Sequence, residues 1–192
     1  MSHTSHDASQ HNTPSYSIRL YQGITPSLAS SAYVDPSAVV IGDVSLGADC
    51  SVWPLSVIRG DVNQIKIGSR SNIQDGCVIH VSRPSSDQPR GFATHIGEDV
   101  TVGHKVMLHG CTIGSRVMIG MGAIVLDGAI IEDDVIVGAG ALVTPGKRLT
   151  SGYLYTGSPA RQARPLKDSE REHFIANAAN YVDLKNDYVS QS

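Results

Sequence analysis

The 192-residue sequence is poor in aromatic residues, which make up 5% of it, although 41% of the chain is hydrophobic. A core of large rings is therefore excluded, and the composition predicts one domain with an aliphatic core. The sequence also lacks any run of basic residues, and its formal net charge is −3. We therefore expect neither nucleic acid nor an anionic membrane surface as a partner.

Hydrophobic stretches of membrane-spanning length are also missing from the sequence. The first residues, MSHTSHDASQHNTPS, have no apolar segment of the kind that directs secretion. These two absences predict a cytoplasmic location. The polar composition predicts that residues 1–16 form a disordered tail, whose three histidines have at most an incidental affinity for metal.

Cysteine is scarce as well, with three residues at irregular spacing, which excludes a disulfide framework and a CxxC zinc clamp. An internal repeat explains them. An aliphatic residue recurs at every sixth position, apart from a three-residue excess at residues 62–64, a long loop at residues 81–92 and one shortened rung at Gly110. These rungs are Val34, Val40, Leu46, Val52, Ile58, Ile67, Ile73, Ile79, Ile96, Val102, Leu108, Ile113, Ile119, Val125, Ile131, Val137 and Val143. The position two residues before each rung is usually small or β-branched. Cys50, Cys77 and Cys111 all occupy it, so we interpret them as inward-facing fillers.

A hexapeptide repeat with frequent glycine is typical of a parallel β-helix, in which three short strands make one triangular coil. The rungs predict about six coils within residues 17–150, with a long loop at residues 81–92. Every third rung from Leu46 to Ile113 is followed by glycine, as expected when equivalent positions recur once per coil. Residues 151–192 form a C-terminal extension with an expected helix at about 169–188, for which Ser169 and Glu172 form a capping-box pattern.

Two histidines, His80 and His109, each follow a rung directly, and their rungs are three apart. Both side chains therefore fall on the same face of the triangular prism that the stacked coils form, one coil apart. Neighbouring strands lie about 4.8 Å apart, a separation at which two imidazoles reach one metal at about 2.1 Å from each nitrogen. Arg59 follows the rung one coil below them.

The third histidine of this region, His104, lies two residues past its rung, near a different corner of the triangle. We do not expect it to close the same site within one chain. If three prisms pack side by side, His104 of one subunit can meet the stacked pair of its neighbour. The pattern therefore predicts an intersubunit metal site and a homotrimer. Zinc is the default ion for imidazole ligands, which also suit Fe2+, Co2+ and Ni2+. His95 and His173 are interpreted as an ordinary edge residue and a solvated helix position.

The segments SVWPLSVIRGDV, RSNIQDGCVIHV and GEDVTVGHKVMLHG resemble the γ-class carbonic anhydrases of the hexapeptide-repeat family. The resemblance covers nearly the whole ordered chain. It implies a left-handed β-helix, and zinc held between subunits of a homotrimer by residues that match His80, His104 and His109.

The resemblance also implies roles for four polar residues. Arg59 and Asp61 match the family's intersubunit ion pair, and Gln74 and Asp75 match polar residues near the zinc-bound water. In such an enzyme, a carbonate dehydratase, three imidazoles leave zinc an open position where the pKa of bound water falls to about 7, as in carbonic anhydrases generally. Attack of the resulting hydroxide on CO2 gives bicarbonate, with Gln74 orienting the nucleophile or the substrate.

The chain departs from the best-characterised members of the family at two acidic positions. Those members carry one glutamate directly after the aspartate that Asp61 matches, and this chain has Val62 there. They carry a second glutamate in the loop that follows the first histidine. Here that loop reads VSRPSSDQPRGF, and its only carboxylate is Asp87. Related small electrophiles are therefore alternative substrates.

Two other functions stay open. The hexapeptide fold also serves trimeric acyltransferases, and GSPAR after the repeats resembles a stretch that those enzymes use near the acyl donor. The second open function is a non-catalytic one, in which zinc stabilises a trimeric scaffold. The three histidines favour the metal enzyme, because an acyltransferase generally needs only one catalytic histidine.

Overall fold

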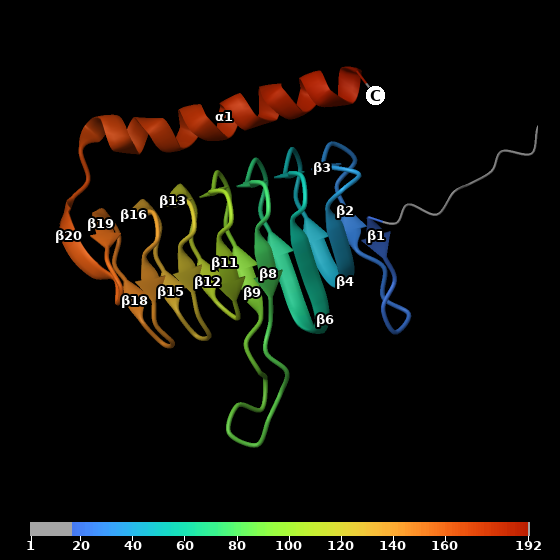
Figure 1. Cartoon of the computed structure of the whole chain (residues 1–192), viewed down its shortest axis with the longest axis horizontal. Coiled ribbons are helices and arrows are strands. Elements are labelled where there is room, and N and C mark those ends of the chain that lie inside the picture. The colour runs from blue at the N-terminus through green and yellow to red at the C-terminus, as the bar shows by residue number, and fades with distance from the viewer. Residues whose placement is uncertain (1–16, 192) are drawn as a thin grey trace, which may run out of the picture.

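The structure is a computed structural model of the chain and describes residues 17–191. Its strands stack into a left-handed parallel β-helix, whose coils follow one another along the long axis while a single helix returns beside them (Figure 1). The predicted tail, residues 1–16 with its histidines, lies outside the described residues. Among residues 17–191, no helix combines the length and the apolar character that crossing a membrane requires.

The first face of the prism is an 8-stranded sheet in the order β20-β19-β16-β13-β10-β7-β5-β3. All of its neighbouring strands are parallel except β19 and β20. Its members are β3 (Tyr33–Val34), β5 (Ser51–Val52), β7 (Asn72–Ile73), β10 (Thr101–Val102), β13 (Val117–Ile119), β16 (Val135–Val137), β19 (Tyr153–Thr156) and β20 (Arg161–Pro165).

The second and third faces belong to one 12-stranded sheet, because the two long strands β4 (Val39–Leu46) and β6 (Val57–Ile67) contribute to both. The second face adds β1 (Ile18–Arg19), β8 (Val78–His80), β11 (Met107–His109), β14 (Ile124–Val125) and β17 (Leu142–Val143). The third face adds β2 (Ser27–Leu28), β9 (Thr94–Ile96), β12 (Thr112–Ile113), β15 (Ile130–Ile131) and β18 (Arg148–Leu149).

The rungs predicted from the sequence form the core of the β-helix. Every one of them from Val40 to Val143 is buried, and so are the positions two residues before them from Ala38 to Ala141. The three cysteines are free thiols within this inner column, and burial raises the pKa of Cys50 and of Cys111 to about 12. The interpretation of the cysteines as inward-facing fillers is therefore confirmed.

The predicted glycine column is also confirmed and has a steric reason. Leu46, Ile67, Ile96 and Ile113 are successive cross-strand partners on the third face. A Cβ on Gly68 would lie 2.4 Å from the carbonyl oxygen of Gly97, one coil further on. Only glycine allows the coils to approach this closely at that corner.

The stack is longer than the seventeen rungs suggest. Strands β1 and β2 precede the first predicted rung, and β18 and β19 follow the last one, with Leu149 and Tyr155 buried in the same columns. The loop at residues 81–92, between β8 and β9, projects from the side of the β-helix (Figure 1).

Helix α1 (Asp168–Ser190) runs back along the β-helix from its C-terminal to its N-terminal end (Figure 1). It begins before the predicted capping box. The side chain of Glu170, not that of Glu172, reaches back to accept a hydrogen bond from the backbone N–H of Lys167 at 2.8 Å. Arg164 fixes this glutamate through two hydrogen bonds. The capping box predicted at Ser169 and Glu172 is therefore wrong.

Candidate metal centre

The side chains of His80 and His109 lie next to each other where β8 and β11 end on the second face. The two residues are cross-strand partners, one coil apart, and their ring centroids are 5.1 Å apart. Nδ1 of His80 lies 3.1 Å from Nε2 of His109. Two nitrogens that share one tetrahedral zinc ion at about 2.1 Å lie about 3.4 Å apart. The facing nitrogens therefore have almost the separation that a common ion requires.

Each histidine of this pair is held by a carboxylate at its other ring nitrogen. Nε2 of His80 lies 3.0 Å from Oδ1 of Asp61, and Nδ1 of His109 lies 2.5 Å from Oδ1 of Asp127. The second oxygen of Asp127 accepts a hydrogen bond from Ser82 at 2.6 Å. Carboxylates in this position typically fix the tautomer and ring orientation of metal-binding histidines.

His104 occupies the corner between the first and second faces, in the turn from β10 to β11. Its Nδ1 lies 2.8 Å from Oδ2 of Asp75, which is in the corresponding turn one coil earlier. The side chain is 45% exposed, so its other nitrogen is accessible to a partner. In all three histidines one ring nitrogen thus contacts a carboxylate, while the second nitrogens of His80 and His109 contact each other.

The structure does not bring His104 to the His80–His109 pair within one chain. Among residues 17–191, no three histidine, cysteine or acidic side chains gather closely enough to hold a metal ion. One chain carries the pair at one edge of the second face and the single histidine at the other edge. Three imidazoles suit a metal ion such as zinc, but within one chain they are divided between the two edges of the second face.

Arg59 and Asp61 form an ion pair inside the chain, beside the histidine pair. Nη1 of Arg59 lies 2.6 Å from Oδ2 of Asp61, whose other oxygen contacts His80. Partial burial raises the pKa of Asp61, but hydrogen bonds from Arg59 and His80 outweigh it and leave that pKa below its usual value. Asp61 is therefore an anion that orients its neighbours, and it is a poor proton acceptor.

Gln74 is buried, and its amide contacts the first face instead of the histidines. Its Nε2 donates to Oδ1 of Asn72 at 3.1 Å, and its backbone oxygen accepts a hydrogen bond from Ser56. The carboxylate of Asp75, the next residue, lies 2.8 Å from Nδ1 of His104. Of the four polar residues singled out in the sequence, Asp61 and Asp75 contact a histidine directly, whereas Gln74 does not.

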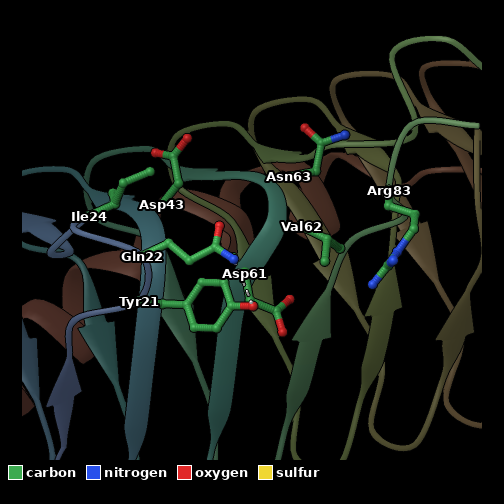
Figure 2. A pocket seen from close by; sticks show the side chains of 9 residues that line it. Tyr21, Gln22, Ile24, Asp43, Asp61, Val62, Asn63 and Arg83 are labelled. Carbon is green, nitrogen blue, oxygen red and sulfur yellow. Dashed lines mark hydrogen bonds between the residues drawn. The ribbon is translucent and has the colours of Figure 1, made fainter.

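A cavity of about 580 Å³ is lined in part by Asp61, the carboxylate that contacts His80 (Figure 2). Its walls come from the turn before β2, from β4 and β6, and from the start of the 81–92 loop. They are Tyr21, Gln22, Ile24, Asp43, Gly60, Asp61, Val62, Asn63 and Arg83. Figure 2 shows the side chain of Arg83 directed toward this space from the loop. A small molecule in the cavity would therefore lie next to the carboxylate that holds His80.

Asp127 is the functional residue that the sequence reasoning missed. It lies two residues past Val125, whose strand β14 is the next neighbour of the strand that carries His109. Counting rungs places Asp127 in the coil next to the one that carries His109, so its nearness to that histidine could have been predicted. What the count does not give is the direction of the side chain, which turns back toward the histidine.

Comparisons with known proteins identify relatives of the whole described fold. The family model for the bacterial transferase hexapeptide, of six repeats, matches residues 93–125 and 110–145. Protein YrdA of Escherichia coli is 58% identical over 91% of this chain and 95% of its own length. Gamma carbonic anhydrase 1 of Arabidopsis thaliana, a mitochondrial protein, is 42% identical over 87% of this chain, which spans 60% of that protein.

Among solved structures, a Bacillus cereus protein described as an acetyltransferase superposes with a TM-score of 0.84. It is 39% identical, and the match covers 91% of this chain and 98% of that one. The same fold is therefore present in proteins whose descriptions name two different chemistries.

Proposed function

The chain belongs to the γ-carbonic anhydrase-like proteins of the hexapeptide-repeat family, and from this premise we propose that it is a zinc-dependent enzyme of carbonic anhydrase type. It acts as a homotrimer on CO2, or on a related small electrophile, with one site at each subunit interface. The observation that carries the proposal is the set of three carboxylate-held histidines, divided between the two edges of one face.

The second face supports assembly because one row of its outward side chains is apolar. The residue directly before each rung points outward, and on this face those residues are cross-strand neighbours. They are Val39, Val57, Val78, Met107, Ile124 and Leu142. On the third face the equivalent residues are Ser45, Lys66, His95, Thr112, Ile130 and Arg148.

Several members of this apolar row are well exposed in the single chain. Val78 is 38% exposed, Met107 42% and Ile124 37%. We assign the row to contact with further copies of the chain, because the histidine pair and His104 flank it on either side. Closed threefold symmetry repeats one heterologous contact, so each pair meets the His104 of a neighbour.

In this assembly His80, His109 and a neighbour's His104 would hold the metal. When bound, a zinc ion with three imidazole ligands would supply Lewis-acid chemistry and would lower the pKa of its bound water to about 7. Fe2+, Co2+ and Ni2+ suit the same ligands. Hydration of CO2 consumes one water molecule and gives bicarbonate and one proton, which has to leave the site.

The remaining residues position these groups. Asp61, Asp75 and Asp127 each hold one histidine so that a defined nitrogen faces the ion. Arg59 keeps Asp61 charged. Gln74 adjoins Asp75 in the turn one coil from His104, and we assign it to orienting the nucleophile or the substrate. No glutamate is available at position 62 for proton removal, so protons leave by another route.

Acyl transfer is the second candidate function. It is favoured by the likeness to the Bacillus cereus protein described as an acetyltransferase. A trimer in which the metal has only a structural role is the third. A cytoplasmic location stays a prediction for all three.

Subunit complementation tests the intersubunit site. His104→Ala chains keep the histidine pair, and His109→Ala chains keep His104, so neither homotrimer has a complete site. After equal amounts are unfolded together and refolded, about a quarter of the interfaces should join an intact pair to an intact His104. We expect about a quarter of the wild-type metal content and CO2 hydration to return.

Each outcome of this experiment has a distinct meaning. No recovery of metal in refolded mixed trimers would refute the intersubunit site. Recovery of metal without CO2 hydration would leave the site in place and refute the carbonic anhydrase activity. Turnover of acetyl-CoA by the metal-free trimer would instead support acyl transfer.

A further inference from the structure

A second cavity, of about 520 Å³, lies between the 81–92 loop and the third face, and none of the three metal-centre histidines lines it. Its walls are Asn63, Gln64, Gln88, Arg90, Gly91, Phe92, Ala93, His95, Gly110, Thr112, Gly128 and Ile130. The volume is within the usual range for cavities that bind small molecules, about 300–1,000 Å³. The cavity opens on the polar face of the prism, away from the apolar row assigned to subunit contact.

The loop side of this cavity is fixed by hydrogen bonds. Nδ2 of Asn63 donates to the backbone oxygens of Ser82 and Arg90, at 3.1 and 2.8 Å. Ser82 and Phe92 exchange two backbone hydrogen bonds across the base of the loop. The Phe92 ring packs over Gly128, where an added Cβ would lie 3.0 Å from its Cε1 atom. These contacts fix the backbone of Arg90 and the ring of Phe92 at the cavity wall, and they leave the exposed Arg90 side chain free to reach a ligand.

The polar side chains in this wall have unused hydrogen-bonding capacity. Within the described part of the chain, the side chains of Gln64, Arg90, His95 and Thr112 make no hydrogen bond or ion pair. The wall contains one arginine and no carboxylate. Lys66, the cross-strand neighbour of His95, adds a second positive charge nearby. Burial and then Lys66 lower the pKa of His95, so its imidazole is neutral at pH 7 and can donate or accept.

We propose that this cavity is a binding site for a small organic anion that carries a carboxylate or phosphate group on an apolar body. Arg90 pairs with the anionic group, since a guanidinium matches the geometry of both groups through two parallel hydrogen bonds. His95 and Thr112, exposed outward on adjacent strands, supply further hydrogen bonds. Phe92 and Ile130 contact the apolar body. The proposal does not depend on the metal centre.

Calorimetric titration of the full-length protein with phenyl phosphate tests the proposal, with benzoate and inorganic phosphate in parallel. We expect saturable binding of phenyl phosphate or benzoate, tighter than that of inorganic phosphate. Comparison of the two aromatic anions shows whether the site prefers phosphate or carboxylate. Arg90→Ala should weaken binding of the preferred anion about tenfold or more, as loss of a charged hydrogen-bonding partner does.

Arg83→Ala is the matched control, because Arg83 comes from the same loop but lines the other cavity (Figure 2). It should leave the affinity unchanged. Equal weakening by both variants would show general attraction of anions to the loop and overturn the proposal. Absence of saturable binding of both aromatic anions would overturn it as well, and so would equal affinity for inorganic phosphate.

Discussion

Replacement of Asp127 by asparagine should lower the affinity for zinc without unfolding the protein. The carboxylate oxygen of Asp127 lies 2.5 Å from Nδ1 of His109, and its other oxygen accepts a hydrogen bond from Ser82. Asparagine keeps the shape and one acceptor oxygen but removes the negative charge that makes the imidazole a stronger ligand. It can also present its amide nitrogen to His109, which would favour the wrong tautomer.

The expected size of the effect follows from the position of this carboxylate. Loss of a partner that orients a metal ligand typically weakens metal affinity 10- to 100-fold, or about 1.4–2.7 kcal/mol. Asp127 is the carboxylate partner of one ligand of three, so binding should weaken without being abolished.

Competition with a chromogenic chelator gives the dissociation constant for zinc in the wild type and the variant. Asp87→Asn is the matched control, since Asp87 is an exposed carboxylate of the 81–92 loop whose oxygen accepts a hydrogen bond only from its neighbour Ser86. Unchanged zinc affinity in Asp127→Asn, or an equal loss in the control, would refute the assigned role of Asp127.

Three further predictions concern assembly and folding. Met107→Glu places a charge within the apolar row of the second face and should convert trimers to monomers in sedimentation analysis, whereas Thr112→Glu on the third face should not. Gly68→Ala should lower the free energy of unfolding in urea by about 1–3 kcal/mol, because its Cβ would lie 2.4 Å from the oxygen of Gly97. Gly146→Ala meets no neighbouring atom and measures only the backbone strain of its φ of +67°, whereas an unchanged free energy of unfolding in Gly68→Ala would refute the steric argument. Arg164 lowers the pKa of Glu170 from 4.5 to about 2, so this glutamate stabilises the fold fully above pH 4.5 and progressively less as the pH falls toward 2. Glu170→Gln should remove this part of the pH dependence in unfolding measured from pH 5 to pH 2, and an unaltered profile would contradict it.

The β-helix was predictable because its stabilising contacts repeat at a fixed spacing along the chain. Counting rungs placed His80 beside His109 and Asp75 beside His104, since register in a parallel stack depends only on the number of residues per coil. The first coil was not recognised because Ile18, the cross-strand partner of Val40, lies ten residues before Leu28 and breaks the six-residue spacing. Leu28 itself continues that spacing, six residues before Val34, and was missed.

Contacts made by long side chains across the fold could not be predicted in this way. Lys185 of the helix is 3% exposed, and its Nζ lies 3.0 Å from Oδ1 of Asp49, an ion pair that no local pattern indicates. The cavity between the 81–92 loop and the third face depends on the path of that loop, whose backbone accepts two hydrogen bonds from Asn63. Whether the histidines bind metal stays a prediction for the experiments above.

The returning helix changes how this β-helix responds to stress. In a stack of repeats each coil contacts only its neighbours, so the ends of such a stack can open independently of its middle. Here α1 bonds to Asp49 near the N-terminal end through Lys185 and to Thr101 in the middle through Asn177. Its first turn bonds to Arg164 at the C-terminal end. One covalent segment thus connects both ends of the stack with its middle, and we expect this connection to make the unfolding of the coils more cooperative than in a stack without such a helix.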